Sequence, residues 1–268
     1  MPKTILITGS TDGIGLETAK MLVSKGHRVL LHGRNLTKLE VAKKSLSALS
    51  GGGSVESYGA DLSRMANVES LAQAVAENHP TLDVLINNAG GFKTADTVTP
   101  DGLDVRFAEN ALAPYLLTQR LLPLMGPSGR VVNLSSAAQT TVDLKALAGQ
   151  ISLSDSAAYA QSKLAITMWS RSLALSLKEN GPAIIAVNPG SMLGSKMVKE
   201  AFGVAGGDIR IGAKILVRVA LSDEFAAVSG QYFDNDTDRL TSPHPDALDP
   251  KKSQAVINVI ESVLVKTA

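Results

Sequence analysis

Tyr159 and Lys163 are the two residues whose types and spacing point most directly to acid–base chemistry. On a helix, residues four apart share a face, with side-chain origins roughly 6 Å apart. Tyrosine ordinarily titrates near pH ~10, so proton exchange near neutral pH needs a pKa lower by about three, or roughly 4 kcal/mol in favour of phenolate. A positive charge on Lys163 has the required sign. The same segment carries Ile166, Trp169 and Leu173 at core spacing, so the pair alone also fits a tyrosine that only packs.

Ser136 adds a hydroxyl group that could act on the same reacting oxygen. It follows the apolar run from Arg130 to Leu134, which predicts a strand. A hydroxyl just beyond a strand end can stabilise charge that develops on a substrate oxygen. Ser135 is the competing candidate at this position.

The segment from Thr8 to Gly15 reads Thr-Gly-Ser-Thr-Asp-Gly-Ile-Gly. Its glycines allow a tight turn and let the backbone approach a pyrophosphate at the N-terminus of the next helix. A glycine triplet alone also fits an unrelated turn or a mononucleotide loop, but an apolar run before it and a helical pattern after it favour a dinucleotide. The residues predicted to contact this dinucleotide are Gly9, Ser10, Thr11, Gly13, Ile14 and Gly15.

Short apolar runs alternate with segments of helical period along most of the chain. The predicted strands cover Lys3 to Thr8, Arg28 to His32, Val55 to Tyr58, Val84 to Asn87, Arg130 to Leu134 and Ala183 to Val187, with a helix after each of the first five. This rhythm predicts an α/β fold with a doubly wound parallel sheet of the Rossmann type between two helical layers. Ligands of such a sheet bind at the carboxyl ends of its strands, where the chemistry-bearing residues fall. Asp249-Pro250 predicts the start of a last helix, which packs or dimerises.

Composition sets limits on the class of protein. With 268 residues and no composition shift, we expect one domain over 1–268, including a substrate loop near 191–207 and a C-terminal extension over 234–268. A net charge of +1 gives no broad attraction to nucleic acid. The absence of cysteine excludes thiolate metal sites and fits a cytoplasmic protein, and the four histidines lack the spacing of metal ligands. We therefore expect no metal and no membrane-spanning segment.

Further motifs follow the later strands in a fixed order. These are Asp61-Leu62, Asn87-Asn88-Ala89-Gly90, Asn110, Asn133-Leu134-Ser135-Ser136, Tyr159 with Lys163, and Pro189-Gly190. Together with the glycine spacing, they resemble the single-domain short-chain dehydrogenase/reductase family over roughly residues 3 to 233. The long segment before Tyr159 and the run from His244 to Asp249 also resemble its retinol-dehydrogenase-like branch.

The resemblance implies roles for these residues. It makes Ser136, rather than Ser135, a catalytic residue with Tyr159 and Lys163, and it lets Lys163 also bind the cofactor ribose. Asn110 would organise a helix irregularity and a water linked to Lys163, although it also fits a plain polar helix residue. The cofactor would contact Asp61, Leu62, Asn88, Ala89, Gly90, Pro189 and Gly190 in addition to the glycine loop.

Two of these cofactor positions have a structural alternative. Asp61 fits either an adenine contact or a cap of the following helix. The segment from Asn88 to Gly90 fits either a ribose contact or a tight turn that stabilises the sheet, or both. The family also usually places a threonine where this chain has Gly194, so how the nicotinamide carboxamide would be held is left open.

Gly33 and Arg34 follow the second predicted strand, at the place where NAD-specific relatives use a carboxylate on the adenosine ribose. A guanidinium can bind a 2′-phosphate by charge-assisted hydrogen bonds, so Arg34 predicts NADP(H), with NAD(H) possible. A solvated surface arginine is the alternative. Many NADP-using relatives also place a basic residue before the second motif glycine, where this chain has Asp12.

The sequence thus predicts an oxidoreductase that transfers hydride between NADP(H) and a carbonyl or alcohol substrate, with Tyr159 as acid or base. A dinucleotide-binding regulator of the same fold without activity is the alternative, but it would not need Ser136, Tyr159 and Lys163 together. Epimerases and dehydratases of the extended relatives have a tighter glycine spacing and a larger C-terminal region. By resemblance, the protein is a homodimer or homotetramer that acts on a small molecule.

Overall fold

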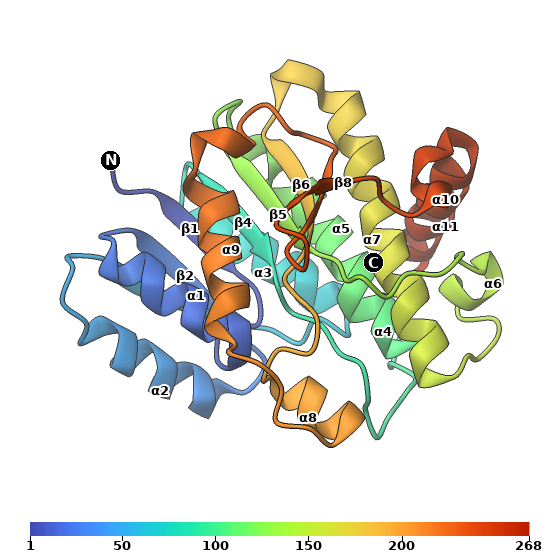
Figure 1. Ribbon diagram of the computed structural model, residues 1–268, viewed down its shortest axis with the longest axis horizontal. Helices are drawn as coiled ribbons and strands as arrows, with labels where there is room; N and C mark the ends of the chain where they lie inside the picture. Colours follow the sequence, from blue (N-terminus) through green and yellow to red (C-terminus); the bar gives the residue numbers. More distant parts are fainter. Residues whose placement is uncertain (268) are drawn as a thin grey trace.

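The computed structural model describes residues 1–267, and an eight-stranded sheet runs through its centre (Figure 1). The strand order is β3-β2-β1-β4-β5-β6-β7-β8, and every neighbouring pair is parallel except β7 with β8. The strands are β1 (Thr4–Ile7), β2 (Arg28–Gly33), β3 (Ser54–Gly59), β4 (Val84–Asn87), β5 (Arg130–Leu134), β6 (Ala183–Asn188), β7 (Tyr232–Asp234) and β8 (Arg239–Thr241). The predicted doubly wound parallel sheet is confirmed.

Helices cover both faces of this sheet (Figure 1). One face packs on α1 (Gly13–Ser24), α2 (Leu36–Ser47) and α9 (Arg210–Leu221). The other packs on α3 (Met65–Asn78), α5 (Ala113–Leu121) and α7 (Asp155–Leu177), with α11 (Pro250–Thr267) against α7. Short helices α4 (Val105–Phe107), α6 (Leu144–Leu147), α8 (Lys196–Phe202) and α10 (Pro245–Leu248) lie in the connections.

The strands are apolar on both faces because both faces are covered. In β1, Ile5 and Ile7 pack into the layer of α1, α2 and α9, whereas Leu6 packs into the opposite layer. All three side chains are fully buried. A parallel strand between two helical layers therefore appears in the sequence as a continuous apolar run, not as an alternating one.

The strand order reverses between β1 and β4, and the loops after these two strands meet there. The Asn88 amide donates to the backbone oxygens of Thr8 (2.9 Å) and Gly9 (3.0 Å). The Thr8 hydroxyl accepts from the backbone N–H groups of Asn88 and Ala89, each at 3.0 Å. This hydrogen-bonded junction fixes the edge of the sheet where a doubly wound fold binds its ligand.

The C-terminal region extends the sheet and covers α7. The strands β7 and β8 form an antiparallel pair that the sequence did not predict. The last helix begins as predicted, with the Asp249 carboxylate accepting from the N–H of Lys251 (2.8 Å) after Pro250 at the first helical position. It packs on the domain, and Tyr115 of α5 donates to Glu261 of α11 (2.8 Å). No helix within residues 1–267 is long and apolar enough to cross a membrane.

Candidate active site

The helix α7 carries Tyr159 and Lys163 on one face, as their spacing predicts. The Lys163 ammonium lies 5.7 Å from the centroid of the Tyr159 ring. Its Nζ donates to the backbone oxygen of Leu134 at the end of β5 (2.8 Å), and Lys163 makes no ion pair within residues 1–267. Burial lowers the pKa of Lys163 to about 8, because an apolar surrounding disfavours its charged form.

Burial acts on Tyr159 as well. It raises the pKa of the Tyr159 phenol, and the hydrogen bond between the side chains of Ser136 and Tyr159 opposes that increase. The effect of burial is larger than that of this hydrogen bond. The protein groups by themselves therefore keep this phenol protonated at neutral pH. The ring also packs edge-to-face on Phe92, with centroids 5.0 Å apart.

The two candidate serines after β5 have different surroundings. The hydroxyl of Ser135 is buried, donates to the backbone oxygen of Lys163 (3.0 Å) and lies 2.7 Å from the Thr167 hydroxyl. It thus joins β5 to α7. The Ser136 hydroxyl instead meets Tyr159 and accepts from the N–H of Ala138 (3.1 Å). The geometry makes Ser136 the serine that faces the tyrosine.

Two residues that the sequence did not single out hold the backbone of Ser136. Tyr232, on β7, donates its hydroxyl to the Ser136 carbonyl (3.0 Å). The Gln139 amide donates to the same carbonyl (2.8 Å). Tyr232 is separated from Ser136 by 96 residues, so no local pattern could have indicated it. The C-terminal part of the sheet therefore supports the candidate catalytic serine.

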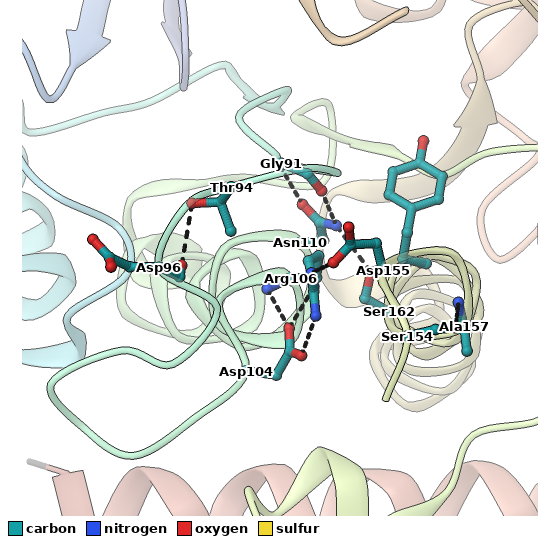
Figure 2. Close-up of polar contacts among 11 residues, drawn as sticks. Gly91, Thr94, Asp96, Asp104, Arg106, Asn110, Ser154, Asp155, Ala157 and Ser162 are labelled. Atoms are coloured by element: carbon teal, nitrogen blue, oxygen red, sulfur yellow. Dashed lines mark hydrogen bonds and ion pairs between the residues drawn. The ribbon is translucent and has the colours of Figure 1, made fainter. Parts of the chain in front are cut away.

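Asn110 lies in a π-helical turn (Ala108–Leu112) between α4 and α5 and is fully buried. Its amide donates to the Gly91 oxygen (3.0 Å) and the Ser162 hydroxyl (2.9 Å), and its Oδ1 accepts from the Gly91 N–H (2.9 Å), as Figure 2 shows. Ser162 in turn donates to the backbone oxygen of Tyr159 (2.7 Å). Asn110 thus connects the loop after β4 to α7, and the irregularity expected around it is present. The water expected beside it stays a prediction.

Arg106 holds the beginning of α7 in place, although no sequence pattern singles it out. Its guanidinium is fully buried and donates to both carboxylate oxygens of Asp104, at 2.7 Å from Nε and 2.5 Å from Nη2. Its Nη1 donates to Asp155, the first residue of α7, at 2.5 Å (Figure 2). Asp155 is one helical turn before Tyr159. This contact therefore positions the turn of the helix that presents the tyrosine.

The glycine loop after β1 depends on glycines for its shape. Gly9 and Gly13 have φ of +63° and +59°, in the left-handed region that other residues avoid. A Cβ on Gly15 would lie 2.3 Å from the Gly9 oxygen and 2.5 Å from the Asn88 amide, so the start of α1 packs directly on the loop. The Asp12 side chain caps α1 by accepting from the Gly13 N–H (2.8 Å).

His32, on β2, supports this loop. Its Nδ1 accepts from the Gly9 N–H (3.1 Å), and its Nε2 lies 3.1 Å from the Ala60 oxygen. Burial lowers the pKa of His32 to about 4, so the ring is neutral at pH 7 and can accept at one nitrogen while donating at the other. The Ser10 hydroxyl also accepts from the His32 N–H (2.9 Å).

The remaining residues of the predicted cofactor segment surround the loop. Thr11 packs on Gly33, where a Cβ would meet its methyl group at 2.6 Å. Ile14 packs into the layer of α1 and α9. Gly90 approaches the catalytic groups closely, because a Cβ there would lie 2.6 Å from Asn110 Oδ1 and 3.5 Å from Lys163 Nζ. Leu62 is buried in the opposite core.

The side chain of Asp61 does not cap α3, so the alternative that made Asp61 the cap of this helix is wrong. Its Oδ1 accepts from the Ser63 N–H (3.0 Å) and stabilises the turn before the helix. The first residue of α3, Met65, donates its N–H to Asp101 (2.9 Å) from a distant loop. Asp61 lies close enough to Glu109 to raise the pKa of that carboxyl, while Arg34 pairs with Glu109 at 3.4 Å. These three charged residues form one cluster beyond β2 and β3.

Pro189 and Gly190 follow β6 in a turn held by the C-terminal region. The Asn235 amide donates to the Pro189 oxygen (2.8 Å), and Gly190 has a φ of +119°. Asp236 accepts from both the backbone N–H (2.7 Å) and the hydroxyl (2.5 Å) of Ser191. The start of the 191–207 segment is therefore anchored to the loop between β7 and β8.

The 191–207 segment contains α8, and the stretches of chain before and after this helix contact each other through glycines. Gly194 donates to the Gly207 oxygen (2.7 Å), and Gly207 donates to the Met192 oxygen (2.8 Å). A Cβ on Gly206 would lie 2.7 Å from Gly194 Cα. A Cβ on Gly194 would lie 2.8 Å from the Gly207 oxygen and 2.9 Å from the Ala205 oxygen, so this close approach leaves no room for a side chain at position 194.

Comparison with known proteins agrees with this geometry. The family of short chain dehydrogenases matches residues 3–203. This chain belongs to the short-chain dehydrogenase family. Human retinol dehydrogenase 13 is 31% identical over 260 residues, which cover 90% of this chain and 78% of that protein. The expected relationship to the retinol-dehydrogenase-like branch is therefore confirmed.

Solved structures show the same fold. An uncharacterized protein from Mycobacterium paratuberculosis superposes with a TM-score of 0.82 at 26% identity, covering 98% of this chain and 93% of that one. A metagenomic short-chain oxidoreductase in complex with NADP superposes with a TM-score of 0.63 at 30% identity, covering 81% and 90% of the two chains. The Rossmann-type architecture of this short-chain dehydrogenase is thus shared over nearly its whole length.

Within this short-chain dehydrogenase, the predicted residues form two groups along one edge of the sheet. Ser136, Tyr159, Lys163 and Asn110 come together between β4, β5 and α7. Arg34 and Asp61 lie beyond β2 and β3, on the other side of the glycine loop. A ligand that touches both groups must extend across the carboxyl ends of several strands, as an extended dinucleotide does.

Proposed function

We propose that this chain transfers a hydride between NADP(H) and a carbonyl or alcohol substrate, with Tyr159 as proton donor or acceptor. The observation that carries the proposal is the surrounding of Tyr159. Its phenol meets the Ser136 hydroxyl, and 5.7 Å from its ring lies the buried Lys163 ammonium, which forms no ion pair with any residue that the structure describes. A buried lysine without a carboxylate partner is costly for stability, which favours a function for it.

The glycine loop fits a dinucleotide. The tight packing of Gly9, Gly15 and Asn88 leaves no room for side chains where the loop meets the N-terminus of α1, and the first N–H groups of a helix attract phosphate. Gly9, Ser10, Thr11, Gly13, Ile14 and Gly15 would hold the pyrophosphate, and Asn88, Ala89, Gly90, Pro189 and Gly190 the nicotinamide half. When bound, the nicotinamide ring supplies the hydride chemistry.

The side chains around Tyr159 have complementary roles. In carbonyl reduction, Tyr159 donates its phenolic proton to the substrate oxygen, and its raised pKa keeps that proton in place at neutral pH. Ser136 donates a hydrogen bond to the same oxygen and stabilises its developing charge. Lys163 provides positive charge that stabilises the phenolate left behind. Asn110 holds the loop before α5 against α7 through Ser162, so that these groups keep their geometry.

Arg34 and the NADP-bound relative support NADP(H) as the preferred dinucleotide. A guanidinium at the end of β2 can bind a 2′-phosphate, and Asp61 next to it can bind adenine. We expect Arg34→Asp to weaken the binding of NADPH more than that of NADH, as measured by titration of each nucleotide. Equal weakening of both would remove Arg34 from phosphate recognition.

Turnover tests the proposed reaction. We expect oxidation of NADPH, followed by its absorbance, when the protein is given a panel of carbonyls that includes retinal, because a retinol dehydrogenase is among its relatives. An alcohol panel with NADP tests the reverse direction. Nucleotide binding without turnover of any compound would favour a dinucleotide-binding regulator. The segment 191–207 is proposed as the substrate loop, and a homodimer or homotetramer is proposed as the assembly, which light scattering can test.

A further inference from the structure

Glu109 lies at the adenosine end of the proposed site, although the reaction does not use it. It precedes Asn110 in the π-helical turn. Its Oε1 accepts from Nη1 of Arg34 at 3.4 Å. The exposed fraction of the side chain is 15% for Glu109 and 72% for Arg34, so a partly buried carboxylate holds an exposed guanidinium. Its other oxygen faces the backbone of Gly91, where an added Cβ would lie 3.1 Å from Oε2.

Some of the charges around Arg34 favour the binding of a phosphate and others oppose it. Burial raises the pKa of Glu109, Arg34 opposes that increase, and Asp61 adds to it. The cluster therefore contains one guanidinium and two carboxyl groups. A 2′-phosphate that binds Arg34 must displace or share the contact with Glu109, and it meets the repulsion of that carboxylate. A neutral ribose 2′-hydroxyl meets no such repulsion and can donate a hydrogen bond to a carboxylate.

We propose that Glu109 is a specificity-determining residue, which holds Arg34 and so reduces the preference of this protein for NADP(H) over NAD(H). The proposal rests on the proposed binding of a nicotinamide dinucleotide. Arg34 attracts the 2′-phosphate and Glu109 limits that attraction, because both act on the same guanidinium. The contact between them joins the end of β2 to the turn before α5 across 75 residues of sequence.

The test is the dissociation constant of NADPH and of NADH for the full chain and for Glu109→Gln, each measured by nucleotide fluorescence. Glutamine keeps the shape of the side chain and removes its charge. Glu109→Ala serves as a second variant in case the amide forms a new contact. Glu77→Gln is the matched control, because Glu77 is an exposed residue near the C-terminal end of α3, at the opposite edge of the sheet.

We expect Glu109→Gln to bind NADPH about tenfold more tightly than the unchanged protein, equivalent to about 1.4 kcal/mol, because Arg34 is then released from its ion pair and can bind the 2′-phosphate. The affinity for NADH should stay within about twofold, and Glu77→Gln should leave both affinities unchanged. Combining Glu109→Gln with Arg34→Gln should abolish most of the gain, because the guanidinium released by the first change is then missing.

Two results would overturn the inference: an equal change in the affinities for NADPH and NADH, or a gain for NADPH that persists without Arg34. The first would make Glu109 a general contact, and the second would exclude the ion pair as the cause. If the unchanged protein bound neither nucleotide, the proposed function itself would fail. Affinity for both nucleotides with an unaltered ratio in Glu109→Gln would overturn only the role of Glu109.

Discussion

Lys163 makes the stability of the protein depend on pH in a direction that can be worked out. Burial lowers the pKa of its ammonium to about 8, whereas an unfolded chain titrates this group at about 10.5. Between these two values the unfolded chain holds a proton that the folded protein lacks. The contribution of Lys163 to stability is therefore fully present above pH ~10.5 and is lost as pH falls through ~8.

The comparison with Lys163→Met isolates this contribution, because methionine keeps an unbranched apolar side chain and does not titrate. From the two pKa values, the free energy of unfolding of the unchanged protein should rise by about 2 kcal/mol relative to Lys163→Met between about pH 7 and about pH 9.5. Other groups titrate in this range, but they do so in both proteins. Their effects cancel in the difference.

The assay is urea unfolding followed by circular dichroism at both pH values, without nucleotide. Lys44→Met, which removes an exposed lysine of α2, controls for the loss of one positive charge and should follow the unchanged protein. A difference between the unchanged protein and Lys163→Met that stays constant with pH would refute the reasoning. It would mean that the folded protein does not disfavour the charge on Lys163.

Three further predictions concern two residues that hold the site in place, His32 and Arg106, and the candidate catalytic residue Ser136. Between about pH 7 and about pH 4.5, the unchanged protein should lose about 2 kcal/mol more of its free energy of unfolding than His32→Gln, because the lowered pKa of His32 makes its contribution to stability disappear as pH falls. An equal loss of unfolding free energy in both proteins would contradict this. Arg106→Met should lower the free energy of urea unfolding by about 3 kcal/mol, since it leaves the Asp104 carboxylate, 12% exposed, without its partner; a change under about 1 kcal/mol would count against that role. Ser136→Ala should lower kcat by about 100-fold or more, and a similar loss of kcat in Ser135→Ala would reverse the choice between the two serines.

The fold was predictable because its signals are local. Each parallel strand is buried on both faces, so runs such as Val84 to Asn87 stand out without knowledge of their neighbours. The start of the last helix was equally visible, since Asp249 and Pro250 act within one turn. The strands β7 and β8 were missed because each has three residues, too few for a pattern to appear.

The candidate site was predictable in its residue types but not in its surroundings. The spacing of Tyr159 and Lys163 places them on one helical face in any context. Contacts between distant segments have no such signal. Tyr232 meets Ser136 across 96 residues, and Arg106 meets Asp155 across 49. These contacts follow from how the elements pack, and that packing is not encoded in any one stretch of sequence.

The pKa of Tyr159 shows the same limit in energetic terms. The sequence indicates a nearby positive charge, which alone would lower this pKa. The structure adds the burial of the phenol, which raises the pKa and outweighs the opposing hydrogen bond with Ser136. The balance of charge and burial can be judged only once the three-dimensional surroundings are known.

The most direct test of the central claim is the replacement of Tyr159 by phenylalanine, measured as kcat in NADPH-dependent carbonyl reduction together with the dissociation constant of NADPH. Phenylalanine keeps the ring that packs on Phe92 and removes only the hydroxyl. We predict a fall in kcat of about 1,000-fold, within the range for loss of a positioned proton donor, with NADPH affinity within about threefold of the unchanged protein. A Tyr159→Phe protein that kept kcat within about tenfold while still binding NADPH would contradict the assignment of Tyr159 as the acid.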